Sequence, residues 1–184
     1  MEYFDVVDEY GNKTGELVER TLAHRTGVPH RTAHVWIFRY KDGVLEVLIQ
    51  KRCLAKDSFP GCYDISSAGH VQAGQEYLES ALRELEEELG VVVSADQLID
   101  CGIHNFHTIN NFRGVPYDDN QASQVYILWL DRDEDQFVLQ EAEIESVRWI
   151  GFEECIQAVK DNAFTNCMEL KELAILKDKL NELK

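Results

Sequence analysis

Three glutamates lie close together near the middle of the chain, at Glu84, Glu87 and Glu88. In a helix with about 3.6 residues per turn, Glu87 and Glu88 flank Glu84 on one face. Arg83 borders this face, and its planar guanidinium can hold a carboxylate or bind a phosphate. Carboxylates at this spacing suit Mg²⁺ or Mn²⁺, because these ions prefer oxygen ligands and leave positions open for water and phosphate oxygens.

The alternative interpretation is a solvated acidic helix face that binds no ligand. Such a face would weaken the helix by roughly a few tenths of a kcal/mol for each pair of like charges. Two features favour the metal site. The guanidinium of Arg83 borders the carboxylates, and a glycine-containing turn at residues 67–70 precedes the helix, where the backbone can approach a ligand closely.

The glutamates belong to a helix that the sequence predicts over residues 75–89, with Gly90 at its end. Its opposite face carries a stripe of leucines, namely Leu78, Leu82, Leu85 and Leu89. A stripe of this kind is typical of a helix that packs on a core. We therefore expect the leucines to be buried and the glutamates to point away from them.

Residues 69–91 read GHVQAGQEYLESALRELEEELGV and resemble the Nudix box, G-x5-E-x7-R-E-U-x-E-E-x-G-U, where U is a bulky aliphatic residue. Eight of the nine fixed positions match. The exception is Gln75, which replaces the first glutamate of the pattern. Glu76 follows it and would substitute after a one-residue slip. We expect the glutamine at residue 75 to affect the reaction rate or the number of bound metals.

The resemblance implies the Nudix fold, which is an α/β (α+β) fold with an α/β/α sandwich around a mixed sheet. It also implies attack by water on a phosphorus of a nucleoside diphosphate that is linked to another group. Carried over by position, Glu84 and Glu88 are the principal Mg²⁺ or Mn²⁺ ligands. Glu87 is the third metal-binding carboxylate and a candidate base, and Arg83 orients the glutamates, so that Glu87 and Arg83 are the expected catalytic residues. The expected substrate-binding residues are Gly69 and His70.

A wider resemblance to isopentenyl-diphosphate isomerases covers roughly residues 4–150, through DVVDEYGN at 5–12, HRTAH at 30–34 and FPG at 59–61. Those isomerases use a cysteine in a C-G-H segment, but residues 68–70 read Ala-Gly-His here. Their E-x-E segment falls near residues 119–121, where Gln121 cannot serve as an acid–base group. We therefore expect an isomerase-like Nudix hydrolase. Isomerisation and a binding module without turnover remain the alternatives.

The histidines allow two interpretations. The metal-binding histidines of the isomerases are matched by His30 and His70, and at a third position by His24, which would form a second metal site. A histidine on a strand or turn is more often structural, because metal ligation needs convergent geometry. His30, His34 and His70 are also candidates for such a site, but the sequence alone favours the structural interpretation for them. His104 and His107 are expected on the surface.

The charge balance bears on the partners. Lysine and arginine together number 18 and aspartate and glutamate 34, which gives a net charge of −16. Such a field repels nucleic acids and anionic membranes, so we expect neither as a partner. A small phosphorylated substrate stays compatible with it, because a bound divalent metal inverts the local field. Five cysteines without a C-x-x-C pair and an acidic amino terminus without a signal-peptide pattern predict a reducing, cytoplasmic location.

We predict three parts: an N-terminal hairpin and extension over 1–28, the Nudix domain over 29–162 and a C-terminal helix within 163–184. The last helix would pack on the body or on a partner chain, as in a homodimer. Strands are predicted at 33–40, 44–51, 98–105, 124–130 and 147–150, and helices at 152–160 and 165–183. A polar loop is predicted over 107–123, where Tyr117, Asp118 and Asp119 are candidates for base stacking or for the catalytic base. Trp36 and Trp129 are expected in the core.

Overall fold

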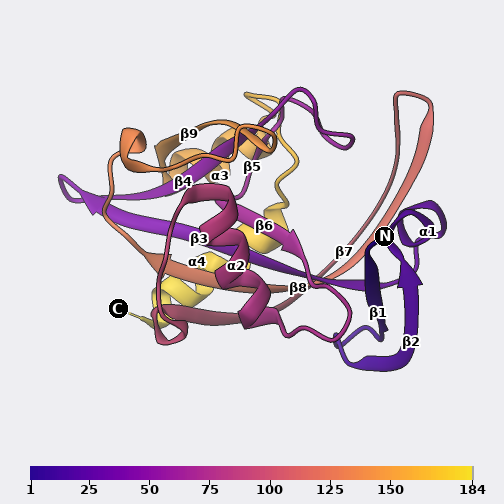
Figure 1. Ribbon diagram of the computed structural model, residues 1–184. Helices are drawn as coiled ribbons and strands as arrows, with labels where there is room; N and C mark the ends of the chain where they lie inside the picture. The colour runs from indigo at the N-terminus through magenta and orange to yellow at the C-terminus, as the bar shows by residue number, and fades with distance from the viewer. Residues whose placement is uncertain (184) are drawn as a thin grey trace.

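A computed structural model describes residues 1–183 (Figure 1). Its strands are β1 (Tyr3–Val7), β2 (Lys13–Glu19), β3 (His30–Lys41), β4 (Val44–Arg52), β5 (Tyr63–Asp64), β6 (Ser67–His70), β7 (Leu98–Phe112), β8 (Val115–Trp129) and β9 (Ile144–Gly151). Its helices are α1 (Arg20–Thr26), α2 (Tyr77–Leu89), α3 (Phe152–Lys160) and α4 (Leu170–Glu182), with short 3-10 helices η1 (Ala95–Gln97) and η2 (Glu134–Gln136).

A mixed sheet is organised around β3. The main strand order is β5-β4-β3-β8-β7, while β6 also pairs with β3 and β9 with β4. β3 is parallel to β8 and antiparallel to β4 and β6. The first half of β3 pairs with β6 and the second half with β4. This division brings the glycine-containing segment of β6 beside the start of β3, where the candidate site lies.

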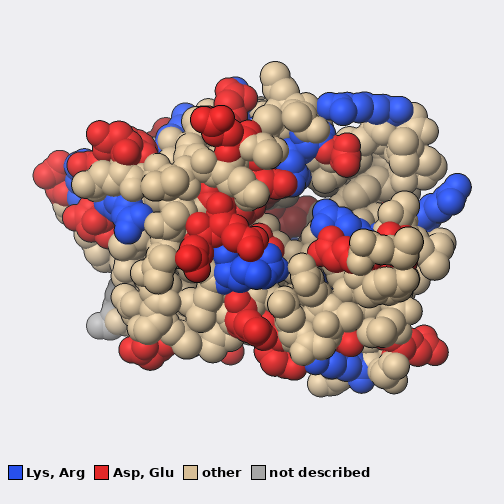
Figure 2. Space-filling view, viewed as in Figure 1, with Lys and Arg blue, Asp and Glu red and all other residues tan. Residues whose placement is uncertain are grey.

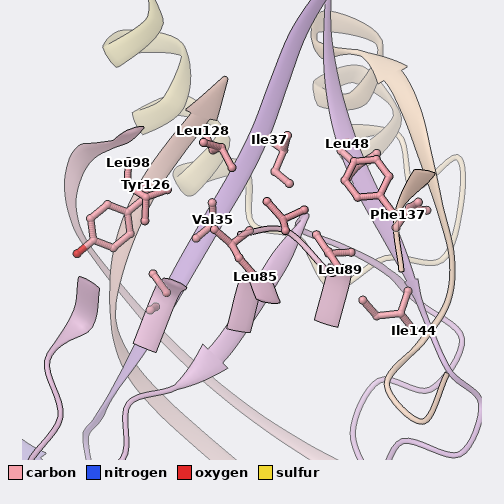
Figure 3. Close-up of a cluster of buried hydrophobic side chains, with 14 of the residues drawn as sticks. Val35, Ile37, Leu48, Leu85, Leu89, Leu98, Tyr126, Leu128, Phe137 and Ile144 are labelled. Atoms are coloured by element: carbon pink, nitrogen blue, oxygen red, sulfur yellow. The ribbon is translucent and has the colours of Figure 1, made fainter. Parts of the chain in front are cut away.

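Helices cover both faces of the sheet. Side chains alternate along β3, so that Val35 and Ile37 face α2, where they pack with Leu85 and Leu89 (Figure 3). Trp36 points to the opposite face, in the cluster that includes side chains of α3 and α4. Full burial of one such side chain stabilises the fold by about 1.5–3 kcal/mol. The arrangement confirms the predicted α/β/α sandwich with a mixed sheet.

The predicted polar loop over 107–123 is wrong. β7 and β8 instead form a long antiparallel hairpin that pairs from Leu98 with Leu128 to Phe112 with Val115. Arg113 and Gly114 make the turn, and both have positive φ angles (53° and 84°), as a type I′ turn requires. The hairpin extends beyond the sheet (Figure 1), so neither of its faces is fully buried there. The outer part therefore lacks the apolar alternation that marks a half-buried strand.

The N-terminal residues form a small sheet of their own, in which β1 pairs with β2. Arg31 of β3 connects this hairpin to the loop before α2. Its Nη2 donates to Asp5 Oδ2 at 2.9 Å and to the Gln75 carbonyl at 2.6 Å. Because Arg31 is almost fully buried, these bonds hold the N-terminal hairpin and the Nudix-box segment in a fixed relation.

The C-terminal helix begins five residues later than predicted, at Leu170 instead of residue 165. The segment before it is extended, and the backbones of Thr165 and Cys167 exchange hydrogen bonds with Tyr63 of β5. The helix packs on the body of the chain through Leu173 and Leu176. No helix among residues 1–183 combines the length and the apolar character needed to cross a membrane.

Two expected positions need correction. Trp36 is fully buried as predicted, but Trp129 is 37% exposed and stacks on Tyr40 with ring centroids 5.6 Å apart. Trp129 is the last residue of β8 and lies outside the buried cluster that contains Trp36. His104 is buried and not on the surface, because β7 lies under α4, whereas His107 is exposed and pairs with Asp118.

Candidate active site

The Nudix-box carboxylates lie where α2 meets β6. Glu88 is only 6% exposed, and it accepts hydrogen bonds from Ser67 Oγ at 2.7 Å and from the Ala68 amide at 3.2 Å. Glu84 lies against Gly69 so closely that a Cβ at residue 69 would overlap the Glu84 carboxyl group. Gly69 is therefore required for this close approach. The predicted turn at residues 67–70 is wrong, because these residues form strand β6, and the group that approaches the Gly69 backbone is the Glu84 side chain.

The carboxylates fit a divalent cation. Burial raises the pKa of Glu88 to about 8, and the neighbouring Glu84 adds to the shift. Burial also raises the pKa of Glu84, although Arg83 opposes this effect. A buried carboxyl group, Glu88, and a partly buried one, Glu84, therefore lie close together, and a hard cation such as Mg²⁺ or Mn²⁺ would supply the positive charge that stabilises their ionised forms. The absence of a side chain at residue 69 lets the Glu84 carboxyl group pack directly against the backbone of β6.

Arg83 connects the carboxylates to each other. Its Nη2 lies 2.8 Å from Glu84 Oε1 and its Nη1 lies 2.9 Å from Glu87 Oε2. Nη2 also donates to the carbonyl of His70 at 3.4 Å. Glu87 is the most exposed of the three box carboxylates, with a side chain 52% exposed. Arg83 is thus placed to orient Glu84 and Glu87, the role implied by the resemblance.

Neither Gln75 nor Glu76 supplies a further metal ligand. The side-chain oxygen of Gln75 accepts a hydrogen bond from Ser80 Oγ at 3.2 Å. The Glu76 carboxylate pairs with Lys13 at 2.7 Å and with Arg31 at 3.4 Å. Glu76 therefore connects the loop before α2 to the N-terminal hairpin and does not replace the missing glutamate of the pattern.

A second group of potential ligands comes from four separate elements. His24 of α1, His30 of β3, His70 of β6 and Asp119 of β8 each offer one ligand atom, and these atoms all lie within 4.8 Å of one another. The Nε2 atoms of His24 and His70 are 3.0 Å apart, and His30 Nε2 is 3.4 Å from Asp119 Oδ1. We call these four residues the His–Asp cluster.

The His–Asp cluster also fits a cation. His30 Nε2 and Asp119 Oδ1 are buried and have no hydrogen-bond partner. Burial lowers the pKa of His24 to about 4 and lowers that of His70, which keeps both imidazoles neutral, as metal ligands must be. A tetrahedral ion with bonds of about 2.1 Å separates its ligand atoms by about 3.4 Å, close to the observed spacing.

The structure therefore brings together three of the four histidines that the sequence singled out as candidate ligands. His34 is not among them, because its ring pairs with Glu172 of α4. Asp119 completes the cluster, and its neighbour Tyr117 donates to Asp119 Oδ2 at 3.1 Å and stacks on His24. Asp118 instead pairs with His107 on the outer part of the hairpin.

A cavity of about 360 Å³ is lined by His70 and Asp119 of the His–Asp cluster and by residues of β6, the strand against which α2 packs. Gly69 and His70, which the sequence proposed as substrate-binding residues, line the cavity together with Arg20, Arg52 and Lys56. Figure 2 shows acidic side chains gathered over α2 beside a hollow, with basic side chains near its rim. Sequence reasoning missed Arg52 and Lys56, although two basic residues shortly before the Phe59-Pro60-Gly61 break were a usable signal.

The basic side chains at the cavity are held by neighbours. Arg52 Nη1 lies 3.0 Å from Asp64 Oδ2, and Arg52 Nη2 donates to the Ser58 carbonyl at 3.0 Å. Lys56 forms an ion pair with Glu143. Burial lowers the pKa of Lys56, an effect that an anionic ligand nearby would reverse. The cavity lining thus contains two basic groups that are fixed by acidic neighbours, Asp64 and Glu143, which also line it.

Comparisons with known proteins agree with this geometry. The profile of the NUDIX domain matches residues 28–167. Nudix hydrolase 3 of Arabidopsis thaliana is 39% identical over 155 residues, which make up 83% of this chain but only 20% of that protein. An uncharacterized Nudix hydrolase of Clostridium acetobutylicum is 32% identical over 155 residues, or 83% of this chain and 71% of that protein.

Solved structures share the fold. A crystal structure of a Deinococcus radiodurans protein has a TM-score of 0.69 and 21% identity, with 96% of this chain and 98% of that chain covered. The Ap4A hydrolase of C. elegans, in a binary complex, has a TM-score of 0.54 and 20% identity, with 83% and 98% covered. These likenesses show the fold alone. With the domain match over most of its length, the chain belongs to the NUDIX family.

Proposed function

We propose that the protein is a Mg²⁺- or Mn²⁺-dependent hydrolase that cleaves the diphosphate linkage of a small nucleoside-diphosphate-type substrate. The observation that carries the proposal is the close approach of two carboxylates, the partly buried Glu84 and the buried Glu88, to the glycine-containing strand that lines the cavity. Arg52 and Lys56 supply positive charge for the phosphates elsewhere in the cavity.

Each box residue has a role that its position supports. Glu84, Glu88 and Glu87 would hold the divalent ion, which when bound neutralises phosphate oxygens and acidifies the attacking water. Arg83 fixes the orientation of Glu84 and Glu87 through its two ion pairs. Glu87 is the candidate base, because it is the most exposed of the three and is accessible to a water molecule from which it could take a proton.

The His–Asp cluster is proposed as a second cation site. Its support is the pair of buried, unpartnered atoms on His30 and Asp119 and the spacing of the four ligand atoms. Three nitrogen ligands favour a transition metal such as Zn²⁺ or Mn²⁺ over Mg²⁺. These histidines also support placing the chain in an isomerase-like branch of the family.

Isomerase activity is less well supported. Ala68 lines the cavity where the isomerase pattern has its acid–base cysteine. The amide of Gln121 donates to Asp119 Oδ2 at 2.7 Å, and an amide cannot exchange a proton as a carboxylic acid does. Water-dependent hydrolysis needs neither group. The acidic surface, with a net charge of −16, supports a small molecule and not a nucleic acid as the partner. The free cysteines support a reducing compartment such as the cytoplasm.

The proposal is tested by incubating the protein with Mg²⁺ or Mn²⁺ in ¹⁸O-labelled water and a panel of diphosphate compounds. The panel contains nucleoside di- and triphosphates, dinucleoside polyphosphates, nucleotide sugars and coenzyme A. We expect ¹⁸O in a phosphate-containing product, and a rate that falls by orders of magnitude in Glu84→Gln and Glu88→Gln. Glu86→Gln, on the exposed side of the same helix, is the matched control.

Other outcomes would contradict the proposal. Full activity in Glu84→Gln and Glu88→Gln would remove the metal role of the box. Thermal stabilisation by a nucleotide without any product would favour a binding module. Metal-dependent incorporation of deuterium into the allylic product of isopentenyl diphosphate would favour the isomerase.

A further inference from the structure

A buried ion pair lies at the floor of the cavity, between β3 and the C-terminal helix. Glu172 of α4 is 3% exposed, and its carboxylate accepts hydrogen bonds from His34 Nδ1 at 3.0 Å and from Trp36 Nε1 at 2.7 Å. His34 and Glu172 both line the cavity. Neither residue is used by the proposed hydrolytic steps or belongs to the His–Asp cluster.

The ion pair fixes the direction in which the His34 ring donates. Because Glu172 takes the hydrogen on Nδ1, the opposite nitrogen, Nε2, is left for other partners. Burial lowers the pKa of His34, but Glu172, with Asp64 and Asp119, raises it overall, which favours a ring that carries a hydrogen on both nitrogens. The charged or titratable groups that face His34 from the surrounding elements are Glu172 of α4, Asp64 of β5, Asp119 of β8 and His104 of β7.

The surroundings of Nε2 are polar on one side. His34 Nε2 lies 3.3 Å from Thr32 Oγ1, and this hydroxyl is 2.7 Å from Ser123 Oγ and 3.3 Å from Gln121 Oε1. Phe106 lines the same cavity. A hydrocarbon chain on this floor would cover buried donors and acceptors without pairing them, which is unfavourable. A polar group with an apolar face suits both kinds of neighbour.

We propose that His34 is a specificity-determining residue, which donates a hydrogen bond from Nε2 to an acceptor atom of the group linked to the diphosphate. Glu172 is the positioning residue that fixes the His34 ring. The linked group is therefore of the nucleoside class, with ring or hydroxyl acceptors, and not a hydrocarbon chain. This inference rests on the proposed function to the extent that the diphosphate occupies the end of the cavity beside β6.

The first test measures kcat and KM for a nucleoside diphosphate and for methyl diphosphate, which lacks the linked group. We expect Glu172→Gln and His34→Leu to raise the nucleoside-diphosphate KM by about tenfold, with kcat within about threefold of wild type. Neither should change the KM for methyl diphosphate. His34→Gln should restore most of the affinity, because its amide donates near the position of Nε2. Glu182→Gln, on the exposed end of α4, is the control.

Equal losses with both substrates would show a merely structural role and overturn the proposal, as would an unchanged nucleoside KM in both variants. A wild-type preference for isopentenyl diphosphate over every nucleoside diphosphate would also overturn it. If Glu172→Gln fails to fold, His34→Leu combined with Glu172→Gln removes the unpaired charge and answers the same question.

The second test does not depend on hydrolysis. Binding of the four nucleoside 5′-monophosphates is measured by calorimetry in the absence of divalent cations. We expect wild type to bind at least one of them, and His34→Leu to bind it about tenfold more weakly. Such binding without turnover of any diphosphate would overturn the proposed function but keep the subsite. Hydrolysis together with binding that is independent of His34 would overturn the subsite alone.

Discussion

Replacing Gly69 with alanine would test the position of Glu84 without touching a charged residue. A Cβ at residue 69 would overlap the carboxyl carbon, one oxygen and Cγ of Glu84. Gly69 does not have a positive φ angle, so alanine itself is compatible with the backbone. The overlap is relieved by moving the Glu84 side chain away from β6. The variant therefore shifts one proposed metal ligand and leaves the composition of the site unchanged.

The expected effect of Gly69→Ala follows from two free energies, the loss of folding stability and the loss of transition-state stabilisation. Inserting one carbon into a packed contact costs about 1–3 kcal/mol, and we expect the lower end, because the end of the Glu84 side chain is flexible. A shift of about 1 Å in a group that positions the reaction lowers the rate by about a hundredfold. That loss corresponds to about 2.7 kcal/mol. The loss in activity should therefore exceed the loss in stability.

The assay is a Mg²⁺ titration of the initial rate together with urea unfolding. Gly151→Ala is the matched control, because the nearest atoms to its new Cβ are 3.7 Å away and its φ angle is −55°. We expect Gly69→Ala to lose about a hundredfold in rate with a small decrease in the free energy of unfolding, and Gly151→Ala to retain its rate. A folded Gly69→Ala protein with the rate and Mg²⁺ dependence of wild type would refute the assignment of Glu84.

Three further predictions concern stability. In EDTA, Glu88→Gln should be more stable than wild type. The pKa of the wild-type carboxyl group is about 4.5 in the unfolded chain and about 8 in the folded protein, so only wild type loses stability as the pH rises between these values. Urea unfolding at several pH values measures the difference. Glu172→Gln should lower the free energy of unfolding by about 3–5 kcal/mol. The raised pKa of His34 stabilises the folded protein below pH 6.5, and the lowered pKa of Glu172 stabilises it above pH 4.5. The difference in the free energy of unfolding between wild type and Glu172→Gln should therefore be largest between these two pH values. A difference that does not change with pH would contradict the ion pair. Arg31→Met should expose the N-terminal hairpin to limited proteolysis before the rest of the chain, and an unchanged cleavage order would show that Arg31 does not hold it.

The Nudix-box helix could be predicted because local features agree with each other. Leucines at helical spacing require a buried face, Gly90 ends the helix with a left-handed φ angle of 63°, and the glutamates are left on the other side. The helix starts at Tyr77 instead of residue 75, because the backbone at Gln75 accepts a hydrogen bond from Arg31. Contacts of this kind join segments that are distant in the sequence, so they cannot be predicted from the local periodicity of the residues.

The rest of the site depends on such distant contacts. The His–Asp cluster takes ligands from four elements, and Asp119 lies in a segment whose polar composition resembles a loop. Its strand pairing became visible only with the partner β7 beside it. Glu172 was missed because an acidic residue in an amphipathic helix normally faces solvent. It lies next to the apolar residues Leu173 and Leu176, and a carboxylate at the border of such a stripe was the available signal.

The central claim is that the carboxylates of α2 bind a divalent cation where a diphosphate can reach it. Anomalous scattering from crystals grown with Mn²⁺ and a nucleoside diphosphate tests this most directly. The account predicts a manganese peak about 2.1 Å from carboxylate oxygens of Glu84 and Glu88, next to Gly69 and the diphosphate. Manganese confined to the His–Asp cluster, or no peak beside α2 while the nucleotide is bound, would contradict it.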